Sequence, residues 1–567
     1  MKFFLALLFF LIPLVWSRYL NANYLSTKTF FFYLASSLAL LGLPDKVNLR
    51  QIPKPLLYAL VLVISHYLAS HLFEQPWMYT FYPFKVVWDY FGVTFPEQQW
   101  WNVFYLFKML GFCFICAYIY SQNLQIEGFI KRYNLAFFAV AAFIFSLSIY
   151  QVFKFRVLES NIETLVILST FGNVNMFAEF LVLILPLFYI WLRNEDKVFY
   201  CIKALFFAAL IFLLLYTRSR SAWIGMVLWF VIIGRTRLQK WDWVGAATAL
   251  ALFLLSHFTA PGVDKIDKFI PSSFHTRSSL YQGSVQLLAD KPLGIGMGQF
   301  MNEIVPYLLD KPVRAAEFSY YDQPHSEFLK WGIQFGWGFL ALTIFIFSYL
   351  GYLVYKKYVL DSKNTSNIFF AGSFLVLFPQ VLFQFPFENP ASAMYIAIVF
   401  GVFLSSFPYG TILNLRWVKP LLAVFAFAGI FNSFYFLGSI YLESHFPVSA
   451  DVMNVVCKVY PVNFKACHWK NKNLLQIKNI QAFRSEFKND FTVNPFYCDN
   501  LRLLPEYFNY GSDEKRTCEA ILLYDFIYKG QRTFPIESMP VCHKYTVPIQ
   551  FNSPKQFSTD FRQWFAK

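Results

Sequence analysis

Long apolar runs, separated by short polar segments, dominate the pattern of hydrophobic and polar positions along this chain. Runs of about 18 or more apolar residues are typical of helices that cross a membrane. The pattern predicts about thirteen transmembrane helices, at residues 3–16, 29–43, 55–71, 102–120, 133–150, 176–192, 201–216, 221–234, 243–257, 327–354, 367–385, 390–407 and 420–441. We therefore expect an all-α polytopic membrane protein.

Composition supports this prediction and removes other classes of protein. Hydrophobic residues make up 57% of the 567 residues and charged residues only 14%, so the chain cannot cover a core with polar surface as a soluble protein does. The net charge of +15 does not indicate a nucleic-acid partner, because many of the basic residues fall in short loops between the apolar runs, where they set orientation. We expect no nucleic acid among its partners.

The basic residues also set the orientation in the bilayer. They lie in every second loop, as Lys46, Arg50 and Lys54; Lys131 and Arg132; Arg193 and Lys197; Arg235, Arg237 and Lys240; Lys356, Lys357 and Lys363; and Arg416 and Lys419. By the positive-inside rule these loops face the cytoplasm. The N-terminus is then cytoplasmic, and everything after residue 441 lies outside.

Two domains are expected from the distribution of the apolar runs. Residues 1–441 form the transmembrane domain, whose largest outer loop is 258–326, and residues 442–567 form a small, mainly helical domain outside the membrane. This tail holds five of the eight cysteines, so one or two disulfides are expected in an oxidising compartment. Pro461 and Pro495 lie at about the 34-residue period of helical-hairpin repeats.

Two arginines stand on the outer side, in the stretch YTRSRSAWIGM. Arg218 and Arg220 separate two apolar runs, and an arginine at the bilayer centre would cost roughly 2.5 to 3.5 kcal/mol. One interpretation makes them anchors that reach the membrane interface or lipid headgroups. The other makes them a cationic binding site, which their place on the outer face favours, because the positive-inside rule biases basic residues toward the opposite side.

The largest outer loop carries further candidates. Arg277 lies in FHTRSSLYQ, and the arginine fork suits phosphate because it donates two parallel hydrogen bonds. His325, in YYDQPHSEFLKWG, opens the next span and can accept a proton near neutral pH. The alternatives without a catalytic or binding role are a solvated charge for Arg277 and a capping or interface histidine for His325. The glycines of GIGMG lack dinucleotide-binding spacing, so we expect a tight turn there.

Several polar residues near the span ends are possible substrate contacts. Glu388, in FPFENP, can hydrogen-bond a sugar or pair with an arginine, or it can cap the helix that begins at Pro390. Asn173 and Asn175 are substrate contacts or helix caps, and the sequence does not choose between these roles. Tyr321 is a further possible contact, close to His325 in the outer loop.

Several of these segments, taken in order, resemble a known family. They are STFGNVNMFAEFLVLILP (169–186), TRSRSAW (217–223), Arg277, PLGIGMGQF (292–300), PHSEFLKWGIQFGWGF (324–339) and FPFENPASAMYIAIVFGVF (385–403). Their order over roughly residues 165–405 is similar to that of the bacterial O-antigen ligase and polymerase superfamily, which includes the protein O-oligosaccharyltransferases. The first third of the chain shares only its hydrophobicity with that superfamily.

The resemblance implies a GT-C-like glycosyltransferase on the periplasmic face of the bacterial inner membrane. Such an enzyme passes a glycan from a polyprenyl diphosphate (undecaprenyl diphosphate) carrier to an acceptor hydroxyl. By resemblance, Arg220 and Arg277 hold the donor diphosphate with Arg218 as a helper, and His325 activates the acceptor hydroxyl or helps to orient it. The family often has asparagine after this histidine, whereas this chain has Ser326.

No cofactor and no metal are expected for this reaction. A divalent metal would need clustered carboxylates, and the outer loops contain no D-x-D motif. Arginines can instead stabilise the charge that grows on the leaving diphosphate. The sequence therefore favours a metal-independent transferase.

The acceptor and two other classes of function stay open. Lipid A core would make the protein a ligase, a second lipid-linked glycan would make it a polymerase, and a secreted or pilin protein would make it an O-oligosaccharyltransferase. A transporter or flippase for lipid-linked sugar would have its polar residues near the bilayer midplane, in repeated halves, which the sequence does not show. A non-catalytic envelope-assembly protein is the remaining alternative.

Overall fold

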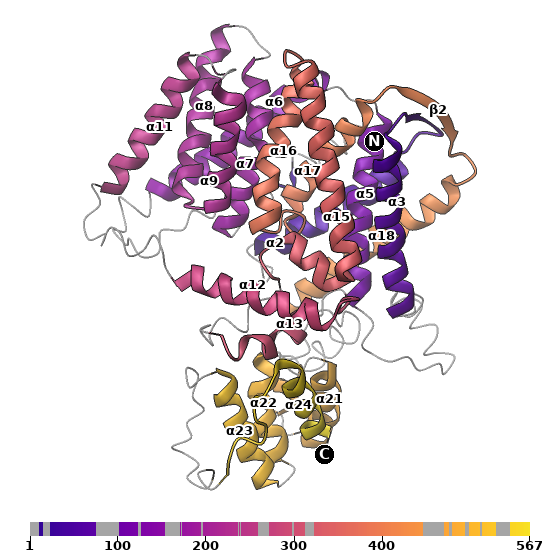
Figure 1. Cartoon of the computed structure of the whole chain (residues 1–567), viewed down its shortest axis with the longest axis vertical. Coiled ribbons are helices and arrows are strands. Elements are labelled where there is room, and N and C mark those ends of the chain that lie inside the picture. Colours follow the sequence, from indigo (N-terminus) through magenta and orange to yellow (C-terminus); the bar gives the residue numbers. More distant parts are fainter. Residues whose placement is uncertain are drawn as a thin grey trace. The chain divides into compact units, whose positions relative to one another are not determined.

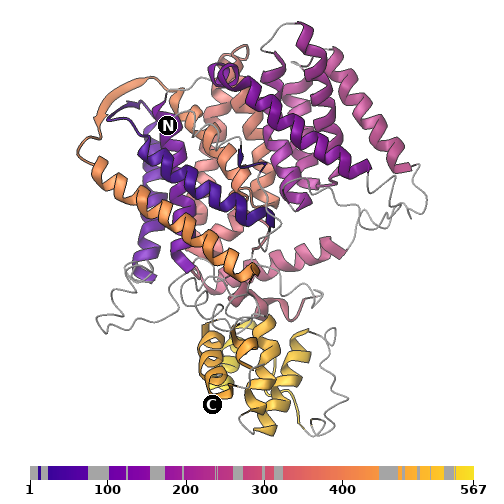
Figure 2. The same cartoon turned by 180° about the vertical axis from the view of Figure 1, so that it is seen from behind.

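The computed structural model is built almost entirely of helices (Figure 1 and Figure 2). It describes residues 11–14, 23–74, 101–122, 126–153, 171, 173–193, 197–235, 238, 240–258, 272–296, 300–311, 323–445, 470–475, 479–493, 498–510, 513–528, 542 and 545–566. A helix lies over each predicted span from 29–43 onward, and most of the first span, 3–16, lies outside the described residues. The helical prediction is confirmed for these segments.

The apolar helices follow the predicted spans closely. They are α2 (Asn23–Leu41), α3 (Lys54–Glu74), α5 (Trp101–Ser121), α6 (Ile126–Phe153), α7 (Val174–Arg193), α8 (Lys197–Tyr216), α9 (Arg220–Trp229) with its π-helical turn η5 (Phe230–Gly234), α11 (Lys240–Phe258), α15 (Glu327–Leu360), α16 (Thr365–Phe383), α17 (Pro390–Ser405) and α18 (Lys419–His445). Four stretches, Val174–Trp191, Glu327–Leu360, Thr365–Phe383 and Lys419–Gly438, are long and apolar enough to cross a membrane, and others form shorter apolar helices. The architecture is that of a multi-pass membrane protein, while the number thirteen stays a prediction.

The remaining elements lie in the expected outer loop, in the tail and in one unexpected ribbon. The loop forms α12 (Ser272–Asp290), α13 (Phe300–Ile304) and the 3-10 helix η6 (Val305–Leu308), and the tail forms α21 (Ile480–Val493), α22 (Cys498–Asn509), α23 (Glu514–Tyr528) and α24 (Pro554–Ala566). Strand β1 (Lys46–Arg50) pairs antiparallel with β2 (Tyr409–Asn414). The ribbon departs from the all-α expectation.

The chain divides into two compact units, of which the first contains residues 1–61, 107–265 and 344–440. Its core is α7, which packs on α8, α9, α16 and α17. Glycines let these helices approach closely, as is common in membrane bundles. A Cβ at Gly372 of α16, for instance, would lie 2.7 Å from the indole nitrogen of Trp229.

The second unit contains residues 62–106, 266–343 and 441–567, so the tail helices belong with those of the outer loop. Helix α22 packs on α23, and α24 contacts η6. Cys518 and Cys542 form a disulfide in a buried cluster with Ile521, which confirms that the tail contains a disulfide. The division at residue 441 into two independent domains stays a prediction.

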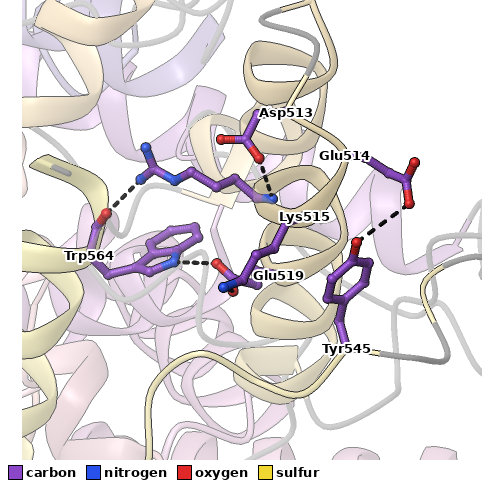
Figure 3. Close-up of polar contacts among 7 residues, drawn as sticks. Asp513, Glu514, Lys515, Glu519, Tyr545 and Trp564 are labelled. Atoms are coloured by element: carbon purple, nitrogen blue, oxygen red, sulfur yellow. Dashed lines mark hydrogen bonds and ion pairs between the residues drawn. The ribbon is translucent and has the colours of Figure 1, made fainter.

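Polar contacts hold α24 against α23 in this unit (Figure 3). The indole Nε1 of Trp564 donates to Glu519 at 2.8 Å. The Arg516 guanidinium donates to the carbonyls of Trp564 (2.5 Å) and Phe565 (3.3 Å). Arg516 therefore neutralises the carbonyl end of α24, where a cation is favoured by the helix dipole.

Candidate functional site

A tight turn between α8 and α9 presents Arg218 and Arg220. The backbone N–H of Arg218 donates to the carbonyl of Leu215 at 3.2 Å, and Arg220 is the first residue of α9. Both arginine side chains are exposed, whereas Ser219 and Ser221, on either side of Arg220, are buried. The turn therefore places two permanent cations on the surface at one end of the helix pair.

The backbone of this turn is strained. Arg218 has φ +54°, a left-handed conformation that costs a residue with a Cβ about 1 to 2 kcal/mol. Among the described residues other than glycine, positive φ occurs only at Arg218 and at His325, also +54°. Such strain persists where the surroundings enforce it, and it clusters at functional sites. Both strained residues are among the site candidates that the sequence predicts.

His325 lies directly before α15 and is supported by α12. Arg277 and Tyr281 stand one turn apart on one face of α12, and the Tyr281 hydroxyl donates to the carbonyl of His325 at 3.0 Å. Burial, and secondly the positive charge of Arg277, lower the pKa of His325 from 6.5 to about 4. The imidazole is therefore neutral at pH 7, and a neutral imidazole can accept a proton.

The glycine-containing loop after α12 binds to a break in α15. Gly294 (φ +96°) and Gly336 (φ +86°) both have left-handed backbones, and Gly336 interrupts α15. The N–H of Ile295 donates to the carbonyl of Ile333 (2.8 Å), and that of Trp337 donates to the carbonyl of Pro292 (3.0 Å). The described part of GIGMG thus joins the loop backbone to the helix that follows His325.

Two residues of the first turn of α15, Glu327 and Lys330, are not among the candidates that the sequence predicts. Glu327 is 0% exposed, and its carboxylate lies 3.5 Å from the ammonium of Lys330, which is also buried. This buried ion pair lies next to His325 in the first turn of α15, and removal of one partner of such a pair is strongly destabilising. The acidic–basic spacing of three residues in HSEFLK was the available signal.

The other candidates have mixed outcomes. The side chain of Asn173 accepts hydrogen bonds from the N–H groups of Asn175 (2.8 Å) and Met176 (3.3 Å), so Asn173 caps α7. The expected cap of α17 at Glu388 is instead Asn389, whose side chain accepts from Ala391 at 3.2 Å. Tyr321 lies outside the described residues. Substrate contacts by Glu388, Asn173, Asn175 and Tyr321 stay predictions.

The candidates fall into two groups in separate units. Arg218 and Arg220 belong to the first unit, while Arg277 and His325 belong to the second, where they share α12 and the start of α15. Within the described part of the chain, no group of three or more His, Cys, Asp or Glu residues could hold a metal ion. The four candidates in these two groups are three arginines, which are permanent cations, and one histidine, which can act as a base.

Comparison with known proteins identifies the class. The apolar helices define a multi-pass membrane protein. Residues 204–346 match the O-antigen ligase family, so the chain contains a domain of that family, and the resemblance noted from the sequence is confirmed over this range. The matched range includes Arg218, Arg220, Arg277 and His325. The family implies an enzyme that transfers glycans from a lipid-linked substrate at a membrane. No curated protein matches the chain.

Proposed function

We propose that this protein transfers a glycan from a polyprenyl diphosphate carrier to an acceptor hydroxyl on the periplasmic face of the inner membrane. Arg220 and Arg277 bind the donor diphosphate with help from Arg218, and His325 takes the proton of the acceptor. The observation that carries the proposal is the family match over residues 204–346, which spans all four residues. The strained backbones of Arg218 and His325 support it.

The reaction is a displacement at the anomeric carbon of the donor sugar. The bond from this carbon to the diphosphate oxygen breaks while a bond to the acceptor oxygen forms, and the hydroxyl proton moves to the imidazole of His325. Negative charge grows on the leaving diphosphate, so fixed guanidinium groups stabilise the transition state more than the ground state. Arginines serve this role without a metal, and no cofactor is needed.

The electrostatics of α12 connect donor binding to proton transfer. The charge of Arg277 contributes to the low pKa of His325. A diphosphate bound to Arg277 offsets that charge and raises the pKa of the imidazole, because a nearby anion favours the protonated form. His325 then becomes a stronger base when the donor is in place, which limits the reaction to the complex with donor.

The acceptor is a lipid A core, a lipid-linked glycan or a secreted or pilin protein. The helical tail favours the last two, since it adds a folded surface with a disulfide to the unit that holds His325. A C-terminal helix that contacts η6 of the outer loop links this surface to the same unit. The test therefore compares acceptors directly.

Transfer in purified proteoliposomes tests the proposal. Polyprenyl diphosphate glycan is supplied with lipid A core, with a candidate pilin, or with no added acceptor. We expect Arg220→Ala, Arg277→Ala and His325→Ala each to lower transfer about 100-fold or more, the size of effect that removal of one preorganised catalytic group has in other enzymes. Arg416→Ala, at an exposed arginine outside the candidate site, should transfer like wild type. Full activity of the three alanine variants would refute the assignment of the site, and carrier crossing the bilayer without any product would favour a transporter.

A further inference from the structure

A buried polar junction lies where α7, α9 and α16 meet in the first unit. A Cβ at Gly225 of α9 would be 3.2 Å from the carbonyl oxygen of Val376 in α16 and 3.4 Å from the side chain of Val182 in α7. Gly372, one turn earlier in α16, faces Trp229 of α9. The two helices are therefore antiparallel, and their contact runs from Trp229 toward Arg220.

One turn further along this contact, the facing residues become polar. Ser221 of α9 lies four residues before Gly225, and Glu179 of α7 lies three residues before Val182. Gln380 of the antiparallel α16 lies four residues after Val376. Helical periodicity therefore places all three at this level, toward the Arg220 end of the contact. All three side chains are buried, Gln380 at 0% and Glu179 at 1% exposure. Arg220 adjoins Ser221 in the chain, so the junction lies beneath the exposed arginine turn.

Asn389, the N-cap residue of α17, completes the junction. Its side-chain amide donates to the carboxylate of Glu179 (3.3 Å), to the carbonyl of Met176 (3.2 Å) and to the hydroxyl of Ser392 (2.9 Å). These bonds tie the start of α17 to the start of α7. Glu179 is thus held in place by a partner on another helix.

Gln380 is a residue at this junction whose polar side chain the helix packing does not explain. Neither its amide oxygen nor its amide nitrogen has a hydrogen-bond partner among the described residues, although the side chain is fully buried. A buried polar group without a partner costs about 1 to 3 kcal/mol, whereas leucine at the same place would cost nothing of this kind. A buried amide at the level of this polar junction is instead suited to bind a polar ligand, because it offers both an acceptor and two donors.

We propose that Gln380, with Glu179 and Asn389 beside it, forms a subsite for the sugar residue attached to the donor diphosphate. The proposal rests on the proposed function, in which Arg220 holds that diphosphate. A sugar hydroxyl or acetamido group can both donate to and accept from the Gln380 amide, and the Glu179 carboxylate adds a second acceptor. The subsite therefore recognises the glycan, while the arginines recognise the diphosphate of the carrier.

Binding measurements on the purified full-length protein in nanodiscs test the subsite without requiring transfer. The affinity for polyprenyl diphosphate glycan is compared with that for sugar-free polyprenyl diphosphate. In wild type the glycan-bearing carrier should bind more tightly. In Gln380→Leu this preference should fall about tenfold, the equivalent of roughly 1.4 kcal/mol, while affinity for the sugar-free carrier stays the same.

Two further variants keep the test sharp. Ser373→Ala removes another buried polar group of α16, two turns from the junction, and should keep the full preference. Gln380→Met repeats the apolar replacement with a flexible side chain, in case leucine is poorly accommodated.

The proposal would be overturned if Gln380→Leu kept the full preference and became more stable, since the amide would then be only a packing residue. An equal loss of affinity for both carriers, or a loss confined to a glycan acceptor, would overturn it as well. Transfer assays separate this inference from the proposed function. If Gln380→Leu loses the preference for the glycan-bearing carrier but wild type transfers no glycan, only the proposed function is refuted. If wild type transfers glycan but Gln380→Leu keeps the preference, only the subsite is refuted.

Discussion

The contact between the glycine loop and α15 allows a sharp prediction for Gly336→Ala. A Cβ at residue 336 would lie 2.5 Å from the carbonyl oxygen of Pro292 and 2.8 Å from the carbonyl carbon of Leu293, which is far inside normal contact distance. Its φ of +86° adds a conformational cost of about 1 to 2 kcal/mol for any residue with a side chain. The loop must therefore move away from the helix.

The size of the effect follows from the hydrogen bonds that such a movement breaks. Three backbone hydrogen bonds join the loop to the helix, at 2.8, 3.0 and 3.1 Å, and each contributes about 1 kcal/mol. Losing one to three of them, together with the strained φ, gives a destabilisation of about 2 to 5 kcal/mol. The loop also lies on the helix that begins directly after His325, so transfer should fall along with stability.

Gly338→Ala is the matched control, only two residues away. A Cβ at Gly338 would meet nothing within 4 Å, and alanine is favoured over glycine in a helix by about 0.5 to 1 kcal/mol. Unfolding of both variants, followed by heat or denaturant in the same detergent, should show a loss for Gly336→Ala and none for Gly338→Ala. Equal stability of the two variants would refute the interlock of loop and helix.

Three other changes test the electrostatics and the tail. Arg277→Gln should raise the pKa of His325 above about 4 yet leave it below 6.5, because burial persists, as histidine NMR titration would show. In wild type, stability should fall as the pH drops from 6.5 toward 4, since the unfolded chain binds this proton first. Cys518→Ser opens a loop with a separation of 24 residues and should cost about 3 kcal/mol, with faster hydrogen exchange in α23. Arg516→Ala should lower the free energy of opening of α24 by about 1.5 to 3 kcal/mol, measured by the same hydrogen exchange. Lys515→Ala should change it little, because the Lys515 side chain is 68% exposed.

Much of the fold could be predicted because a membrane restricts the structure of the chain. Backbone polar groups in a bilayer must bond within their own segment, so an apolar run of sufficient length becomes a helix. The ribbon of β1 and β2 escaped prediction because its strands are short and lie far apart in the sequence. β1 (KVNLR) alternates polar and apolar residues, but only over five positions, and β2 (YGTILN) does not alternate. The break in α15 escaped as well. Gly336 and Gly338 look alike in GIQFGWGF, and the fold separates them through the approach of Pro292 and the φ of +86° at Gly336.

The candidate site was partly predictable for a similar reason. Arg218 and Arg220 stand out in the sequence because charges between apolar runs are rare. In the structure both side chains are exposed in the turn between α8 and α9. The buried pair of Glu327 and Lys330 did not stand out, since a charged first turn usually faces solvent. Gln380 was hidden within an apolar run, and its significance depends on which helices face it.

The ribbon of β1 and β2 also constrains the order of events during synthesis. Asp45 and Lys419, which form an ion pair beside the ribbon, are 374 residues apart in the sequence. A ribosome adding about 5 to 20 residues per second needs roughly 20 to 75 seconds to make the intervening chain. Throughout that interval β1 has no partner strand, although α2 is already made and α3 follows early in the interval. A truncated chain that ends before residue 409 would contain the whole family-matched region and still leave β1 unpaired.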